Sequence, residues 1–275
     1  MRKSRIVLAA VLYPIYTIAA VLILYPVVWM IYSSFKSNMD ILSNVFALPR
    51  QISFENYVTV FTTGGLGRFF ANSLFISSVS VAGLILFSAM AAYAFATFEF
   101  RGKKALFLFC LIGMMVPTQS LIISGFKWMS VLKLVNTYWA LIFTYLGWGS
   151  FGIQVLRNFF QSVPKEVKEA ALIDGAGHWH MFTKIMLPLA RPSISTVTIF
   201  YFMWVWNEFI YPLVYMQEPE KFTVPLGILF FNDRYNVDWG LQMAGLAVAT
   251  IPPLIVYYTF QKQFIRGILA GAVKG

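Results

Sequence analysis

The stretch FFANSLFISSVSVAGLILFSAMAAYAFATF, residues 69–98, decides the fold, because it carries no charged side chain over its whole length. A helix that crosses a bilayer needs about 20 predominantly apolar residues, so this stretch is long enough to cross one. Comparable intervals recur along the chain, one of them interrupted by a glutamate. They are 6–35, 69–98, 105–126, 134–156, the interval after Arg191 that contains Glu208, and 239–261. Six intervals predict an all-α membrane protein with six transmembrane helices.

The composition supports a membrane protein. Of the 275 residues, 59% are hydrophobic and 12% are charged, which is more apolar surface than a soluble core of this length could bury. The formal charge of +10 is not arranged as a basic stripe on a soluble module, so we expect no nucleic-acid partner. The one cysteine, Cys110, lies in an apolar run. We expect it to pack inside the protein, and no disulfide can form within the chain.

The distribution of basic residues predicts the orientation. With both termini in the cytoplasm, about two thirds of the 21 lysines and arginines fall on the inner side, as the positive-inside rule requires. The interval 6–35 is much longer than the apolar region of a cleavable signal peptide, so it is expected to remain as the first span. We therefore expect one transmembrane domain over 1–275, with an inner loop at 157–191 and extracytoplasmic loops at 36–68 and 217–238.

The inner loop contains SVPKEVKEAALIDGAG, residues 162–177. Pro164 suits a first helical turn, the following residues favour a helix, and Gly175 can adopt the left-handed geometry that ends one. Trp179 and Phe182 then continue at helical spacing toward Leu187. The sequence predicts a short helix, a sharp turn and a second helix, which could simply pack on the inner ends of its own bundle.

This loop resembles the EAA signature of permease subunits in binding-protein-dependent ABC importers. The residues that carry the resemblance, or accompany it in the loop, are Glu169, Ala170, Ala171, Asp174, Gly175, Ile185, Leu187 and Pro188. The resemblance implies a type I importer permease fold and a coupling role for these residues against a separate ATPase. It implies a small face at Ala170 and Ala171 for close approach, and a bond from Glu169 to an arginine of the ATPase.

Further strings extend the resemblance over nearly the whole chain. They are Phe54–Tyr57, Ala91–Phe95, Trp206–Phe209 and Gly271–Gly275, and they look like the second, G-type permease subunit of maltose-type importers of carbohydrate uptake class 1. The resemblance implies a sugar substrate and a bacterial plasma (inner) membrane location. It also implies three kinds of partner: a second six-span permease, two ATPase subunits and an extracytoplasmic solute-binding protein.

Four residues near the fifth interval are candidates for the substrate pathway: Trp204, Trp206, Asn207 and Glu208. Glu208 is the one acid inside a predicted span, and ionisable groups there are often functional. For Glu208 we favour a structural role near the outer mouth over direct contact with the substrate. The tryptophans could stack on a sugar or could belong to the aromatic belt at the membrane surface.

Motifs of catalysis are absent from the sequence, which has no Walker A loop, no nucleophile elbow and no HExxH. We therefore expect a transporter subunit without catalytic residues, metal or cofactor of its own, with ATP and Mg²⁺ bound by the ATPase partner. His178 and His180 are two apart and do not share a helix face, so they form no metal pair. Two alternatives stay open: import of an osmolyte, polyol or peptide instead of a sugar, and an ATP-independent carrier or channel.

Overall fold

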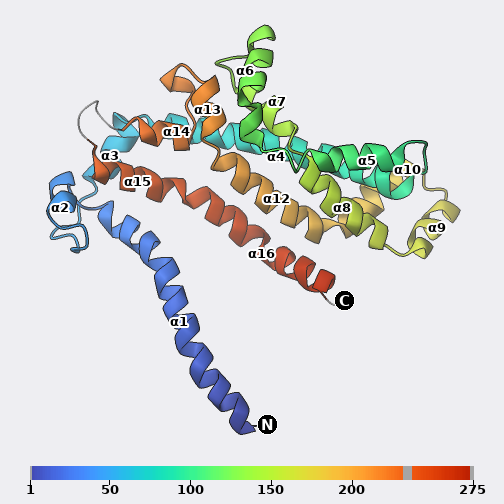
Figure 1. Cartoon of the computed structure of the whole chain (residues 1–275), viewed down its shortest axis with the longest axis horizontal. Helices are drawn as coiled ribbons and strands as arrows, with labels where there is room; N and C mark the ends of the chain where they lie inside the picture. Colours follow the sequence, from blue (N-terminus) through green and yellow to red (C-terminus); the bar gives the residue numbers. More distant parts are fainter. Residues whose placement is uncertain (1, 232–236, 273–275) are drawn as a thin grey trace. The chain divides into compact units, whose positions relative to one another are not determined.

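The computed structural model describes the backbone of residues 2–231 and 237–272, and the side chains of 12–231 and 237–265. Within these residues every regular element is a helix, which confirms the all-α prediction (Figure 1). The chain divides into two compact units, one formed by 1–67 with 227–251 and the other by 68–226 with 252–275. We describe each unit by itself.

The first unit is built from α1 (Arg2–Ser33), α2 (Asn38–Ser43), α3 (Glu55–Thr62), the end of α14 (Val224–Leu229) and α15 (Trp239–Ala249). Asp238 caps the start of helix α15, because its carboxylate accepts a hydrogen bond from the Leu241 amide at 3.0 Å. It packs on α1, α2 and α3. A Cβ atom at Gly240 would lie 2.9 Å from the Lys36 carbonyl oxygen, so glycine permits this close contact.

The second unit is organised around α4 (Leu66–Thr97), with α7 (Tyr138–Leu146), α8 (Ser150–Ser162), α12 (Arg191–Trp206), α13 (Ile210–Tyr215) and α16 (Ile251–Ala272). A buried node joins three of them. The Tyr201 hydroxyl accepts from the Gly152 amide at 2.8 Å, donates to the Gly149 carbonyl at 3.0 Å and lies 3.2 Å from the Ser88 hydroxyl. These bonds satisfy backbone groups at the break between α7 and α8.

Five crossings can be recognised in the described residues by length and composition. Three are long helices, Leu12–Ser33, Leu66–Thr97 and Trp239–Ile265. Two are bent pairs, one of α7 with α8 at 42° and one of His178–Leu189 with Arg191–Trp206 at 76°. These agree with five of the six predicted intervals.

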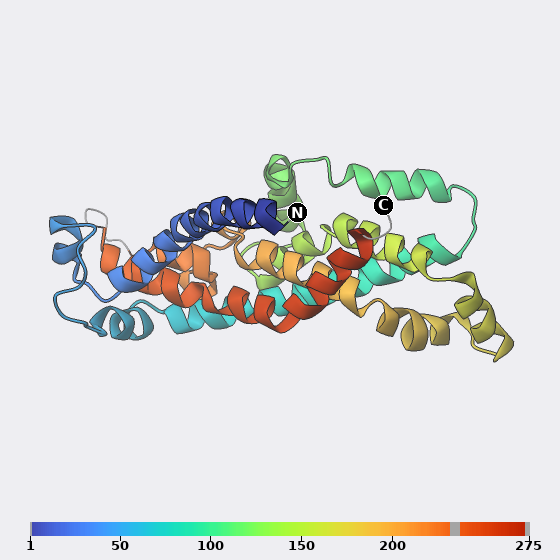
Figure 2. The ribbon, with the colours of Figure 1, turned by 90° about the horizontal axis from the view of Figure 1, so that it is seen from below.

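The sixth interval, 105–126, was expected to be a single crossing and is not one continuous helix. It is divided among α5 (Lys103–Ile112), η1 (Thr118–Leu121) and α6 (Ile122–Val131), as Figure 2 shows. Each ten-residue helix is about 15 Å long, half of what a bilayer core requires. Pro117 lacks the amide hydrogen that a continuous helix would need. The absence of charges in this interval correctly predicted its apolar character, but it did not predict that the helix would be broken.

Candidate functional site

The loop that was predicted to lie on the inner side forms a helical hairpin, residues 164–189, which we call the coupling hairpin after its predicted role. Its first leg is α9 (Lys165–Ile173), preceded by Pro164. The Gly175 amide donates to the Leu172 carbonyl at 3.0 Å, and the Ala176 amide donates to the Ala171 carbonyl at 2.9 Å. With Gly175 at φ +78°, these bonds form a Schellman motif. The predicted helix and its glycine turn are confirmed, and hydrogen bonds pair the backbone groups of the turn.

The second leg runs from His178 to Leu189 as α10 (His178–His180), the wider π-helical turn η2 (Met181–Met186) and α11 (Leu187–Leu189). Pro188 has no amide hydrogen, so the regular hydrogen-bond ladder cannot continue through it. Helix α12 starts at Arg191 with a bend of 76°. The predicted second helix is therefore present, and its direction changes where the membrane-type helix begins.

An aromatic cluster fixes the coupling hairpin to its own unit. The ring of Tyr93, near the end of α4, lies 5.2 Å from that of Phe182 and 6.1 Å from that of Phe160 in α8. The Tyr93 hydroxyl also donates to the His178 carbonyl at 3.4 Å. All three rings are buried. The sequence offered one signal for this cluster, the string Ala91–Phe95, without indicating what Tyr93 contacts.

Two polar residues of the hairpin contact the same region. Lys168 donates to the Phe160 carbonyl at 3.2 Å, and burial, with the charge of Lys165 as a smaller cause, lowers its pKa. The His178 ring packs edge-on against Phe98 at 4.8 Å. These contacts add to the attachment of the hairpin at the ends of α4 and α8.

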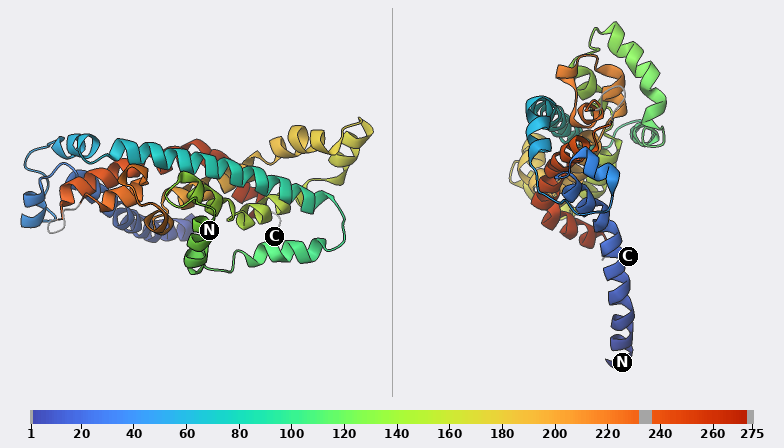
Figure 3. Two further views of the ribbon diagram at one scale, coloured as in Figure 1. Left: turned by 90° about the horizontal axis from the view of Figure 1, so that it is seen from above. Right: turned by 90° about the vertical axis from the view of Figure 1, so that its left-hand side faces the viewer.

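The tip of the coupling hairpin is exposed and partly apolar, and it projects beyond the ends of α4 and α8 (Figures 1 and 3). Ile173 is 86% exposed and Trp179 is 66% exposed. Glu169, Ala170 and Asp174 are also exposed. Ala171 is buried, so the exposed part of the small face predicted for both alanines consists of Ala170.

A large cavity of about 1490 Å³ lies in the second unit. Aromatic rings, uncharged polar groups and one acidic residue share its wall. The lining includes Thr118, Gln119, Ser124, Trp128, Thr144, Trp148, Ser150, Phe151, Phe200, Trp204, Asn207, Glu208, Tyr211 and Tyr215. Such a mixture of apolar faces and a few polar groups is typical of sites for small polar molecules. Cys110 is half-buried and lines a separate cavity of about 510 Å³.

Three of the four candidate pathway residues, Trp204, Asn207 and Glu208, line the large cavity. Trp206 does not, because it is 2% exposed and its ring packs 5.5 Å from that of Phe70. Two positions along a helix separate Trp206 from Trp204, which turns the two side chains to different faces. The Glu208 carboxylate accepts from the amides of Ile210 at 2.8 Å and Tyr211 at 3.1 Å. It therefore caps α13 while facing the cavity.

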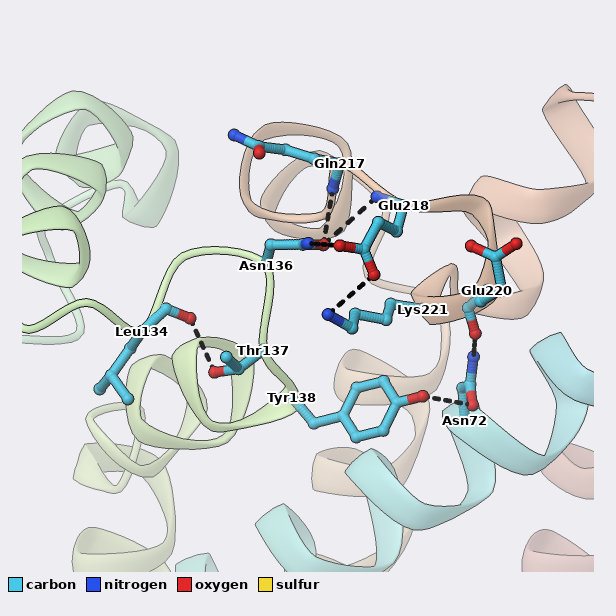
Figure 4. A network of polar contacts seen from close by, with 9 residues as sticks. All are labelled: Asn72, Leu134, Asn136, Thr137, Tyr138, Gln217, Glu218, Glu220 and Lys221. Carbon is cyan, nitrogen blue, oxygen red and sulfur yellow. Dashed lines mark hydrogen bonds and ion pairs between the residues drawn. The ribbon is translucent and has the colours of Figure 1, made fainter.

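A polar network, which we call the outer network, holds the start of the loop 217–238 (Figure 4). Asn136, at φ +62°, accepts from the amides of Gln217 and Glu218 and donates to the Glu218 carboxylate at 2.8 Å. Lys221 forms an ion pair with Glu218 at 2.9 Å. The hydrogen bond from Lys221, followed by that from Asn136, lowers the pKa of Glu218.

The same network reaches α4. The Asn72 amide donates to the carbonyls of Glu220 at 2.8 Å and Phe222 at 3.0 Å, and its oxygen accepts from the Tyr138 hydroxyl at 2.8 Å. Three segments far apart in the sequence are thereby joined on one side of the second unit. No local pattern in the sequence predicts this arrangement, since each residue is an ordinary polar group of a loop or helix end.

Bent apolar helices around a large cavity, with one protruding hairpin attached to them, define a transport permease subunit. The chain belongs to the family described as binding-protein-dependent transport system inner membrane component, whose model matches residues 84–269. It is thus a permease of the inner membrane, and the predicted family is confirmed.

Relatives in the same family are named for several solutes. The chain is 35% identical to the diacetylchitobiose uptake permease NgcG of Streptomyces coelicolor, over 97% of this chain and 89% of the relative. It is 35% identical to the trehalose/maltose permease MalG of Thermococcus litoralis, over 93% of each. The osmoprotective compounds uptake permease GgtD of Synechocystis is 36% identical over 88% of this chain and 84% of that protein.

A solved structure confirms the permease fold. The crystal structure of a bacterial ABC transporter involved in the import of alginate, an acidic polysaccharide, contains a chain with a TM-score of 0.84 and 25% identity. The match covers 96% of this chain and 98% of that one. The type I ABC importer permease fold predicted from the sequence is therefore the fold that this chain adopts.

Proposed function

We propose that this chain is one permease subunit of an ATP-driven sugar importer and receives force from a separate ATPase through the coupling hairpin. One observation carries the proposal: the exposed tip of the hairpin is attached to helices of the same unit. The Tyr93 cluster and the short second leg make this attachment. Helix α12, which follows that leg, contributes Trp204 to the cavity wall. A displacement of the tip is thus transmitted to the cavity through packed elements.

ATP and Mg²⁺ would be bound and hydrolysed by two ATPase subunits, and this chain would supply no catalytic group or cofactor. Ile173, Trp179 and Ala170 offer an apolar surface for the ATPase, and Glu169 offers a carboxylate for an arginine. The different affinities of the ATPase for the inward-open and outward-open states would drive alternating access. This mechanism places the hairpin and both termini in the cytoplasm. It therefore requires the divided segment 103–131 to cross the bilayer in addition to the five recognised crossings.

Two further partners complete the proposed importer. A second six-span permease would form the other half of the pathway, as the resemblance to ABC importer permeases implies. An extracytoplasmic binding protein would deliver the solute to the outer loop 217–238 and to the part of the loop 36–68 that follows Ser53. The family description, which includes dependence on a binding protein, supports this partner.

The cavity wall and the names of several relatives favour a sugar. The apolar C–H face of a sugar ring packs on aromatic rings such as Trp204 and Trp148, while its hydroxyls bond to groups such as Asn207 and Gln119. An osmolyte is the second candidate, because one relative of similar identity is named for osmoprotective compounds.

Reconstitution tests the proposal. The chain, its companion permease, the ATPase and the binding protein are placed in proteoliposomes, and uptake of labelled oligosaccharides, polyols and osmolytes is measured with and without internal ATP. We expect uptake of one sugar class that requires both ATP and the binding protein. Uptake by this chain alone, or uptake that continues without ATP, would instead support a carrier or channel.

A further inference from the structure

The outer loop between α1 and α3 exposes large apolar side chains. We call residues 38–53 the apolar loop. Its exposed hydrophobic residues are Met39, Leu42, Val45, Phe46, Leu48 and Ile52, and of these Met39 is 79% exposed and Phe46 and Leu48 are each 72% exposed. A run of this kind on a surface usually marks contact with a protein or a membrane.

The backbone of the loop is built for a place with little water. Four consecutive carbonyl groups, those of residues 44–47, each accept a hydrogen bond from a side chain. Lys36 donates to Asn44 at 2.9 Å and to Ala47 at 3.0 Å, Trp29 donates to Val45 at 3.0 Å, and Tyr32 donates to Phe46 at 3.3 Å. A loop in water needs no such set, because water satisfies exposed carbonyls. Near lipid, every backbone polar group must find its partner within the protein.

Two of these donors fix the depth of the loop. Helix α1 extends from Arg2 to Ser33, and its uncharged part, which begins at Ile6, is longer than the roughly 20 residues that cross the hydrocarbon core. Trp29 and Tyr32 lie in its last turns, at the level where tryptophan and tyrosine gather in membrane proteins. Carbonyls bonded to them lie at the same level, and Figures 1 and 2 show the loop beside this end of α1.

The charges of the loop do not oppose this position. Lys36 is 2% exposed and its ammonium group faces the two carbonyls. Asp40 accepts a hydrogen bond from the Ser37 hydroxyl at 2.8 Å. Arg50 is exposed near the far end, where a guanidinium can reach phosphate headgroups. Each charge is thus either bonded within the protein or able to meet the polar surface of the bilayer.

We propose that the apolar loop inserts Phe46, Leu48 and their apolar neighbours into the outer surface of the bilayer and anchors α1 at a fixed depth. The occupant of this surface is lipid, because the loop continues the exposed apolar side of α1 at the membrane boundary. The anchor is separate from transport, and it rests on the membrane location of the chain rather than on the proposed ATPase or sugar.

Spin labelling of the complete importer in proteoliposomes tests the anchor. In a Cys110→Ser chain, a nitroxide is attached at Phe46→Cys or Leu48→Cys, with Glu55→Cys, an exposed residue of α3, as the control. Collisions with oxygen, which concentrates in lipid, are compared with collisions with a water-soluble nickel chelate. We expect the ratio of oxygen to nickel collisions to be several-fold higher at 46 and 48 than at 55.

Two results would overturn the anchor. Equal ratios at all three positions would mean that the loop lies in water, and shielding of 46 and 48 from both reagents would mean that a protein covers it. ATP-driven uptake measured in the same proteoliposomes reports on transport independently. A failure of the anchor is thereby distinguished from a failure of the proposed function.

Discussion

The turn of the coupling hairpin offers the sharpest test of its role. Gly175 holds φ +78°, and a Cβ atom placed there would meet nothing within 4 Å. A substitution at this position therefore acts through backbone strain and not through a clash. The left-handed conformation costs an L-residue roughly 1–2 kcal/mol, more for a β-branched side chain and less for asparagine.

That strain can be converted into an expected loss of ATPase binding. If only the ordered hairpin binds the ATPase, a penalty of about 1–2 kcal/mol weakens the complex by at most roughly 5- to 30-fold. We expect the affinity to fall in the order glycine, asparagine, alanine, valine at position 175. The assay is titration of the purified ATPase onto the permease complex in nanodiscs, followed by measurement of stimulated ATP hydrolysis.

A matched control separates the hairpin from general strain. Gly102, between α4 and α5, holds φ +84° and also has open space around its Cβ position. Gly102→Ala carries the same backbone penalty at a site outside the hairpin, so ATPase affinity should remain as in the unchanged chain. Normal ATPase binding by the Gly175→Val chain would contradict the role of the turn, as would a Gly102→Ala chain that binds as weakly as Gly175→Ala does.

Three further predictions concern the attachment, the cavity and the outer network. Tyr93→Ala removes a buried aromatic ring, at a cost of about 3–5 kcal/mol, and should uncouple ATP hydrolysis from uptake, whereas Tyr93→Phe keeps the ring contacts and should retain coupled uptake. Trp204→Ala should raise the KM for sugar uptake, while Trp139→Ala, which lies outside the cavity wall, should not; equal changes in both would remove Trp204 from the pathway. Because the pKa of Glu218 is lower in the folded chain than its usual value of 4.5, the outer network stabilises the loop above pH 4.5 and loses that contribution as the pH falls through the lowered pKa. Hydrogen exchange of residues 217–222 should show this acid-induced loss of protection, and Glu218→Gln should abolish its pH dependence.

Much of the fold could be predicted from hydropathy, because each segment that crosses the lipid must be apolar over about 20 residues. Residues 69–98 read as one apolar run and form one long helix. The interval 105–126 satisfies the same rule and is nevertheless divided, since Pro117 and the contacts of α5 and α6 decide whether an apolar segment continues. The length of a segment without charged residues indicates whether the segment lies in lipid. Whether its helix is continuous also depends on individual residues such as proline.

Part of the candidate site could also be predicted from the sequence, where a residue has a local signal. Gly175 could be recognised because a left-handed turn has a local sequence signal. Ala171 could not be separated from Ala170, as both suit a helix and only the fold of the hairpin buries one of them. Trp206 was placed beside Trp204 by sequence proximity, although a helix turns them apart. The contacts of Tyr93 and Asn136 join residues distant in sequence, which no local pattern reveals.

Proximity of residue 173 to the ATPase is the measurement that bears most directly on the proposed coupling. In a Cys110→Ser chain, Ile173→Cys carries a short photoreactive crosslinker, and Ser43→Cys on α2 serves as the control. In the assembled importer we expect an adduct between position 173 and the ATPase, with a yield that changes when ATP is added, and no adduct from position 43. An importer that takes up its solute while position 173 forms no adduct with the ATPase would contradict the coupling hairpin.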